Sequence, residues 1–263
     1  MANNIGFIGC GNMASAIIKG SIISGYIKPD NIFAFDLIAD KISSLGINKV
    51  DSIEELSSKC NYLFLCVKPQ VIDDVLKTLS KSLTSNHCLV SIAAGVNTGK
   101  ICSYFSFEPK IIRVMPNVCL MYNAGAAALY NSGCNDDEFS FIKGIFDSCG
   151  KTVTVSEDMF DVVTALSGSG PAFCFRFCKK LIEEAVSLGL DEQSAGLLAK
   201  QTLLGSASMM LNSDYSVDEL IKMVSSPNGT TVAGLAEMDK FGFDTSVKAA
   251  VNGAFKRSQE LSK

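Results

Sequence analysis

The feature that most constrains the fold is the glycine motif Gly9-Cys10-Gly11-Asn12-Met13-Ala14, which matches G-x-G-x-x-A. A short apolar segment at residues 5–8 precedes it and an apolar-periodic segment at residues 12–24 follows, as expected for a strand and a helix. The first glycine permits a tight turn, the second lets the backbone approach a pyrophosphate, and the small third residue lets the helix pack closely. We therefore expect a dinucleotide site whose cofactor-binding residues include Gly9, Gly11, Asn12, Met13 and Ala14.

A carboxylate follows the next predicted strand, at residues 32–35. Asp36 lies where an acidic residue accepts hydrogen bonds from the adenosine ribose and repels a 2′-phosphate, which favours NAD(H). A solvated loop residue is the alternative. No arginine is near, but Lys41 could reach a phosphate, so NADH and NADPH both remain open.

The chain has two parts with different patterns. Further apolar segments at residues 62–67, 88–93, 110–115 and 153–155 indicate strands, with helical segments such as residues 73–82 between some of them, which is typical of a parallel sheet covered on both faces. After about residue 157 only helical segments follow, at residues 169–188, 191–211, 217–224, 232–241 and 245–261. We predict an α/β domain at residues 1–157 and an all-helical domain at residues 158–263.

Composition excludes several classes of protein. The net charge is −4 and arginine occurs only at positions 113, 176 and 257, so no nucleic-acid partner is expected. No apolar run reaches the roughly 18 residues of a membrane span, and residues 1–4 lack the segments of a signal peptide, so we expect a cytoplasmic protein. Ten cysteines without a CxxC pair and a single histidine, His87, give no expectation of a metal site.

The chain is poor in acids that could protonate a reduced substrate. A ketone reductase commonly uses a histidine, and His87 lies in a polar segment that indicates a surface position. An imine nitrogen is basic enough to carry a proton before hydride arrives, so a hydroxyl donor suffices. Ser226 and Thr231 lie in a polar segment that leads into a helix, where free N–H groups suit a carboxylate. From composition alone, a polar helix cap explains this segment better.

Six motifs, in order along nearly the whole chain, resemble those of the pyrroline-5-carboxylate reductases. They are Phe7-Ile8-Gly9-Cys10-Gly11-Asn12-Met13-Ala14, Val67-Lys68-Pro69-Gln70, Ala93-Ala94-Gly95, Arg113-Val114-Met115-Pro116-Asn117, Ser167-Gly168-Ser169-Gly170-Pro171-Ala172 and Ser225-Ser226-Pro227-Asn228-Gly229-Thr230-Thr231. Many dehydrogenases share the first motif, whereas the last two together are much more specific.

This resemblance implies an N-terminal Rossmann-type parallel sheet followed by an all-helical C-terminal dimerisation domain. It implies NADPH or NADH as cofactor, 1-pyrroline-5-carboxylate as substrate, L-proline as product, and a homodimer that in such enzymes commonly assembles further to a decamer. The cofactor residues implied are those of the glycine motif together with Asp36, Val67, Lys68, Pro69, Ala93, Ala94 and Gly95. The substrate residues implied are Ser226, Gly229, Thr230 and Thr231, with the Thr231 hydroxyl as the catalytic group near the imine nitrogen.

The chain departs from the family pattern in three places. Asn228 stands where a second glycine is usual, so we expect a left-handed backbone there, which asparagine accepts. Val118-Cys119 replaces the usual Thr-Pro. Asp36 replaces a small hydroxyl residue that contacts the 2′-phosphate in many relatives, which puts the usual NADPH preference in doubt.

Two alternatives remain open. A β-hydroxyacid or 6-phosphogluconate type dehydrogenase would share the glycine motif and use a lysine on a helix of the second domain, for which Lys179 or Lys180 would serve. A non-catalytic dinucleotide sensor on the same fold would bind the cofactor without turnover, because a fold alone does not fix a reaction.

Overall fold

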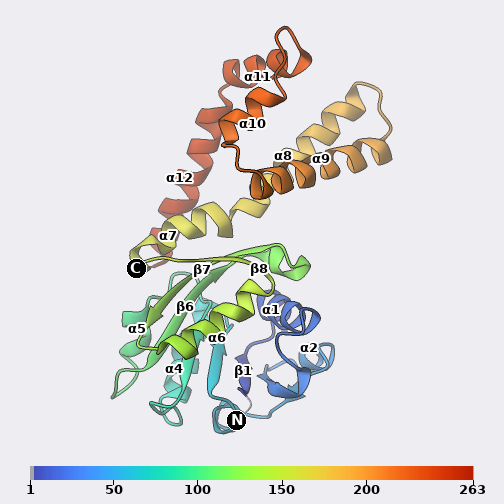
Figure 1. The fold of residues 1–263 in the computed structure, drawn as a ribbon. Coiled ribbons are helices and arrows are strands. Elements are labelled where there is room, and N and C mark those ends of the chain that lie inside the picture. The colour runs from blue at the N-terminus through green and yellow to red at the C-terminus, as the bar shows by residue number, and fades with distance from the viewer. Residues whose placement is uncertain (1–2, 263) are drawn as a thin grey trace. The chain divides into compact units, whose positions relative to one another are not determined.

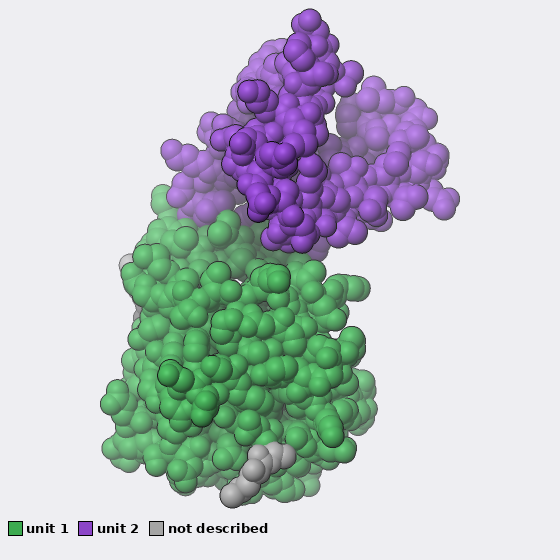
Figure 2. All heavy atoms as spheres, viewed as in Figure 1, with its two compact units in different colours: residues 1–171, 253–263 green, residues 172–252 purple. Residues whose placement is uncertain are grey.

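The structure is a computed structural model that describes residues 3–262. Met1 and Ala2, which form part of the segment that lacks signal-peptide features, lie outside the described residues. By spatial contact the chain forms two compact units, unit 1 (residues 1–171 and 253–263) and unit 2 (residues 172–252), which Figure 2 colours separately. The domain boundary expected at 157/158 from the end of the strand signals remains a proposal.

Unit 1 is built on one eight-stranded sheet in the order β3-β2-β1-β4-β5-β6-β7-β8 (Figure 1). The strands are β1 Ile5–Ile8, β2 Ile32–Phe35, β3 Asn48–Lys49, β4 Tyr62–Leu65, β5 Cys88–Ser91, β6 Lys110–Pro116, β7 Gly125–Ser132 and β8 Gly150–Thr154. Neighbouring strands are parallel except for β6 and β7, which are antiparallel. The Rossmann-type, mostly parallel sheet is therefore confirmed, but β7 and β8 both run opposite to the other six strands, which the sequence did not predict.

Helices cover both faces of the sheet, because successive side chains of a strand point to opposite faces. On one face, Phe64 of β4 belongs to the core that includes Ile17 of α1 and Phe146 of α6. On the other face, Leu63 and Leu65 of β4 pack in the core formed with α3, α4 and α5. The helices of this unit are α1 Asn12–Ile23, α2 Asp40–Ser43, α3 Ile53–Lys59, α4 Ile72–Leu79, α5 Thr98–Cys102, α6 Asp136–Asp147 and α7 Phe160–Val163. Short 3-10 segments lie at η1 Pro29–Asn31, η2 Pro69–Val71, η3 Val118–Tyr122 and η4 Glu157–Met159, and a π-helical turn at η5 Thr164–Gly168.

The central strand β1 is the point at which the strand order reverses, since β2 lies on one side of it and β4 on the other. Ile8 is in register with Phe35 of β2 and with Leu65 of β4. The three strands therefore end side by side, and the residues that follow them meet at one edge of the sheet. Ligands of open α/β sheets bind in the crevice at such a reversal.

Unit 2 and the segments that join it are helical. The helices are α8 Gly170–Ser187, α9 Glu192–Asn212, α10 Val217–Met223, α11 Thr230–Lys240 and α12 Phe243–Leu261. These are the five helices expected from the sequence, although α11 and α12 each begin two residues earlier than expected. Among residues 3–262, no helix has both the length and the apolar character needed to cross a bilayer.

Candidate functional site

The glycine turn after β1 has a backbone that only glycine fits. Gly9 has φ +92°, and a Cβ there would lie 2.9 Å from the Cys66 carbonyl oxygen. Its N–H donates to the Phe35 carbonyl at 2.8 Å, which ties the turn to β2. Ala14 is 1% exposed, so a small side chain is what allows α1 to lie close to the sheet.

The start of α1 is open to a ligand. Gly11 is its N-cap, no side chain caps the helix, and no atom lies within 4 Å of the place where a Gly11 Cβ would be. The first N–H groups of a helix have no partner within the helix and carry its positive dipole end. The backbone N–H groups of Asn12 and Met13 therefore form a site suited to an anion such as a pyrophosphate.

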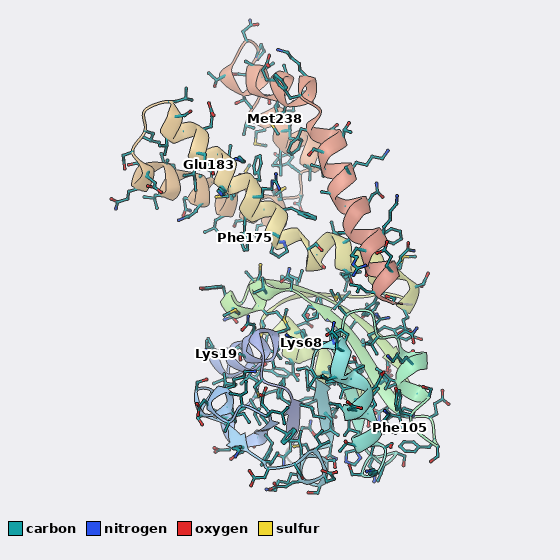
Figure 3. The ribbon with its side chains drawn as sticks, turned by 180° about the vertical axis from the view of Figure 1, so that it is seen from behind. Lys19, Lys68, Phe105, Phe175, Glu183 and Met238 are labelled. Carbon is teal, nitrogen blue, oxygen red and sulfur yellow. The ribbon has the colours of Figure 1, made fainter. Side chains whose placement is uncertain are left out.

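A cavity of about 590 Å³ adjoins this turn. It brings together five of the expected cofactor residues, Gly9, Gly11, Asp36, Val67 and Lys68. The rest of its wall is mainly apolar and includes Ile8, Phe35, Leu37, Ile38, Ile53, Val71 and Val75. Figure 3 labels Lys68, whose side chain lies at the edge of unit 1 where the parallel strands end. A glycine turn, an open helix start and an adjoining apolar cavity fit an extended dinucleotide.

The other expected cofactor residues lie outside the wall of this cavity. Asn12, Met13 and Ala14 form the first turn of α1, and Pro69 begins η2. Ala93, Ala94 and Gly95 follow β5, one strand further along the sheet. Their roles in cofactor binding remain proposals.

Asp36 binds the glycine turn itself. Its Oδ2 accepts a hydrogen bond from the Cys10 N–H at 2.7 Å, and its Oδ1 accepts one from the Ile38 N–H at 2.8 Å. Lys41 Nζ lies 3.6 Å from the same Oδ1. The sequence predicted that Asp36 faces the cofactor, but it did not predict that the carboxylate also holds the turn.

The two cysteines near the turn have thiols that resist ionisation. Burial and the Asp36 charge raise the pKa of the Cys10 thiol to about 12. Burial also raises the pKa of Cys66 well above its ordinary value, with a smaller contribution from Cys10. Since the thiolate is the nucleophile and the metal ligand, both side chains act here as small apolar groups. No cluster of three or more metal-ligating side chains occurs among residues 3–262.

The last turn of α12 packs against the segment that follows β5. Gly95 has φ +75°, and a Cβ there would lie 2.6 Å from the Leu261 carbonyl oxygen, in the last turn of α12. Two hydrogen bonds hold this turn: the Ser258 and Ser262 hydroxyls donate to Asp161 Oδ1 at 2.6 and 3.2 Å. The glycine therefore allows α12 to contact the loop that we expect to line the cofactor.

A partly buried ion pair supports the same region, and the sequence did not indicate it. Arg113 Nη1 donates to Glu157 Oε1 at 3.1 Å, and the guanidinium lies 4.4 Å from the Phe160 ring centroid. Thr98, the first residue of α5, donates its N–H to Glu157 Oε1 and its hydroxyl to Oε2, each at 2.7 Å. Burial lowers the pKa of Arg113, and the Glu157 charge opposes that effect. Glu157 lies 44 residues from Arg113, so no local pattern indicates the pair.

The expected substrate residues in unit 2 form a compact turn. Asn228 has φ +59°, which confirms the left-handed backbone expected there. The Gly229 N–H donates to the Ser226 carbonyl at 2.9 Å, and a Cβ on Gly229 would lie 2.6 Å from Ser226 Oγ. Helix α11 begins at Thr230, and no side chain caps it. This turn thus presents free N–H groups beside the exposed hydroxyls of Ser226, Thr230 and Thr231.

Comparison with known proteins identifies the family. Residues 157–261 match the family described as pyrroline-5-carboxylate reductase dimerisation, and residues 4–95 match NADP oxidoreductase coenzyme F420-dependent. The chain is 34% identical over 268 residues to pyrroline-5-carboxylate reductase of Escherichia coli (strain K12), with 100% of both covered. The chain belongs to the pyrroline-5-carboxylate reductase family.

Solved structures of family members have the same fold. A pyrroline-5-carboxylate reductase from Coxiella burnetii gives a TM-score of 0.92 at 34% identity, with 100% of both chains covered. Pyrroline carboxylate reductase from Plasmodium falciparum with NADP bound gives 0.89 at 32% identity, covering 99% of this chain and 98% of that chain.

Membership of the pyrroline-5-carboxylate reductase family argues against the hydroxyacid dehydrogenase alternative. The lysines on which that alternative depends both pair with Glu183 on the exposed surface of α8. Lys180 Nζ lies 2.6 Å and Lys179 Nζ 3.5 Å from its carboxylate oxygens. Neither ammonium is buried, as a lysine with a tuned proton affinity would be.

Proposed function

We propose that this protein reduces 1-pyrroline-5-carboxylate to L-proline, with NADPH or NADH as the hydride donor. The observation that carries the proposal is the uncapped start of α1 beside a cavity of about 590 Å³, in a chain whose full length matches the reductase family. The reaction consumes one imine, one reduced nicotinamide and one proton, and it forms a C–H and an N–H bond.

The residues of unit 1 would hold the dinucleotide, which when bound supplies a hydride to the imine carbon. The N–H groups of Asn12 and Met13 bind the pyrophosphate, and Asp36 accepts from the ribose. Residues 67–69 and 93–95 position the remainder of the cofactor. Gly9 and Gly95 both have positive φ, and a Cβ at either would lie within 3 Å of a carbonyl oxygen, so both turns depend on glycine.

The turn at residues 226–231 would hold the substrate. The free N–H groups at the start of α11, with the Ser226 and Thr230 hydroxyls, suit the substrate carboxylate. The Thr231 hydroxyl oxygen would accept a hydrogen bond from the N–H of the protonated imine, which favours the protonated form while the carbon takes up the hydride. Gly229 is needed because its Cβ would meet Ser226 Oγ.

We further propose a homodimer formed through the helical unit. Within residues 172–252 the buried apolar residues are Ala195 and Leu220, which is too little for a core. On α9, Leu197, Leu204 and Leu211 recur every seven residues and are 67%, 64% and 75% exposed. A stripe at this spacing is typical of a helix that packs against another helix. Figure 3 labels exposed Phe175 on α8, which adds to this apolar surface. Assembly of such dimers to a decamer remains part of the proposal.

The dimer can be tested with one charge on the stripe. Leu204→Glu is expected to convert the dimer to a monomer in size-exclusion chromatography with light scattering, because it places a charge in the interface. Ser206→Glu adds the same charge to an exposed position on the opposite face of the same helix and serves as the control. A dimeric Leu204→Glu protein would contradict this interface.

We also propose that the protein works in the cytoplasm. All ten cysteines are free thiols, which suits a reducing compartment.

The reductase activity is tested by mixing the protein with racemic pyrroline-5-carboxylate and following loss of the reduced-nicotinamide absorbance, with proline identified as product. Thr231→Ala is expected to lower kcat about 100-fold or more, whereas Thr231→Ser keeps the hydroxyl and most of the activity. A folded protein that binds a nicotinamide dinucleotide but reduces no imine would refute the reductase and favour the sensor.

A further inference from the structure

Asp36 is fixed at the end of β2. Two backbone N–H groups, those of Cys10 and Ile38, donate to its two oxygens at 2.7 and 2.8 Å. Its side chain is only 10% exposed. Hydrogen bonds to an ionised carboxylate are about twice as strong as neutral ones, so turning the group away would break two strong bonds. The negative charge therefore stays beside the glycine turn whichever dinucleotide enters.

The carboxylate lies where the adenosine ribose must pass. Gly11, at the start of the anion site, lines the same cavity as Asp36, and so do the exposed apolar side chains of Leu37 and Ile38, which suit an adenine ring. The ribose joins these two parts of the ligand. A carboxylate has about four acceptor positions, and the backbone uses two of them here, so the ribose hydroxyls of NADH can donate to the others.

Among residues 3–262, no uncompensated cation lies beside Asp36 to bind a 2′-phosphate. Lys41 Nζ is 3.6 Å from Asp36 Oδ1, so its charge is already balanced. The second lysine on the cavity wall, Lys68, follows β4 on the other side of β1 from Asp36. The other carboxylate on the wall, Asp74 of α4, is paired with Lys77 at 3.5 Å, so its charge is balanced as well.

We infer that Asp36, with its charge fixed by the backbone and Lys41 balanced against it, makes this chain prefer NADH to NADPH. The inference rests on the proposed function, since it names the cofactor of that reaction. Repulsion between the partly buried carboxylate and a doubly charged phosphate is expected to weaken NADP+ binding about 100-fold relative to NAD+.

The test is isothermal titration calorimetry of the full-length protein with NAD+ and NADP+ separately, without imine. Asp36→Ser is expected to remove the preference, because the repulsion disappears and Lys41 becomes available to the phosphate. Adding Lys41→Met to that variant should weaken NADP+ binding about tenfold and leave NAD+ binding unchanged. Asp74→Ser removes the other wall carboxylate and is the matched control, with no change in the ratio of the two Kd values.

Equal or tighter binding of NADP+ by the unaltered protein, or an unchanged ratio in a folded Asp36→Ser variant, overturns the inference. If Asp36→Ser does not fold, Lys41→Met alone decides, because it leaves Asp36 unbalanced and must raise the preference for NAD+. A preference for NAD+ without imine turnover would refute the proposed reaction and leave this inference standing. Imine turnover with a preference for NADP+ would support the proposed reaction and refute this inference. Binding of neither dinucleotide would refute the reaction and the inference together.

Discussion

The ion pair between Arg113 and Glu157 offers a quantitative test of how unit 1 is held together. Glu157→Gln keeps the size of the side chain and removes its charge. It leaves the Arg113 guanidinium, 8% exposed, without a counter-charge, and it weakens the two hydrogen bonds from Thr98. Breaking a fully buried pair from one side costs about 3–5 kcal/mol. Since Glu157 is 24% exposed, we expect a loss of about 2–3 kcal/mol in the free energy of unfolding.

The loss can be measured as a fall in Tm by circular dichroism at a fixed protein concentration, because an oligomer's Tm depends on concentration. For a chain of this length, each kcal/mol corresponds to roughly 2–4 °C, so the expected fall is about 5–10 °C. Arg113→Met removes the other partner and keeps an apolar stem against Phe160. The double variant is expected to lose less stability than the sum of the single variants, by about 1–3 kcal/mol.

Asp158→Asn is the matched control, since this neighbouring carboxylate is exposed. If Glu157→Gln melts at the same temperature as Asp158→Asn, or if the two single losses add in the double variant, the ion pair contributes nothing and the reasoning is wrong.

Three further predictions each concern a single residue. Gly95→Ala is expected to lower Tm more than Gly46→Ala, because both residues have positive φ but only Gly95 has a backbone atom, the Leu261 oxygen, at 2.6 Å from its would-be Cβ; equal losses would mean that α12 moves freely. Asn228→Gly should keep the KM for the imine, whereas Asn228→Ala, for which a left-handed backbone costs about 1–2 kcal/mol, should raise it; steady-state kinetics decide. Hydrogen bonds from Ser194 lower the pKa of Asp191, the N-cap of α9. Since its folded pKa is below its unfolded pKa, its charge contributes stability above about pH 4 that is lost as pH falls through the folded pKa. Tm of Asp191→Asn, which keeps the cap, should therefore fall less steeply with acid.

The sequence predicts best those features that depend on the backbone conformation of a single residue. The glycine motif indicated a tight turn between a strand and a helix, and Gly9 has the positive φ that such a turn needs. Asn228 was expected to be left-handed for the same kind of reason, and it is. The helical segment expected at residues 169–188 ends just before Gly189, which has φ +102° and follows α8 by two residues.

What the sequence does not predict is pairing between distant segments. Strand β7 begins with Gly125 and three alanines, which have low strand propensity, and it forms only because β6 and β8 pair with it on both sides. The link from Glu157 to Arg113 and Thr98 spans 44 and 59 residues and follows no period. Nor could the sequence show that Asp36 binds Cys10, since that contact depends on the register of β1 and β2.

The helical unit shows why an apolar periodicity is not by itself evidence of a core. The 3.6-residue pattern located α8 to α12 within a few residues, because it depends only on which side chains share a face. It cannot tell whether that face is covered by the same chain or by another. On α9 the stripe of Leu197, Leu204 and Leu211 is exposed, while the sheet of unit 1 buries nearly all of its apolar strand residues. Exposed apolar area of this extent is costly in water, so the 48% hydrophobic composition is better explained by a second copy of the chain than by a larger internal core.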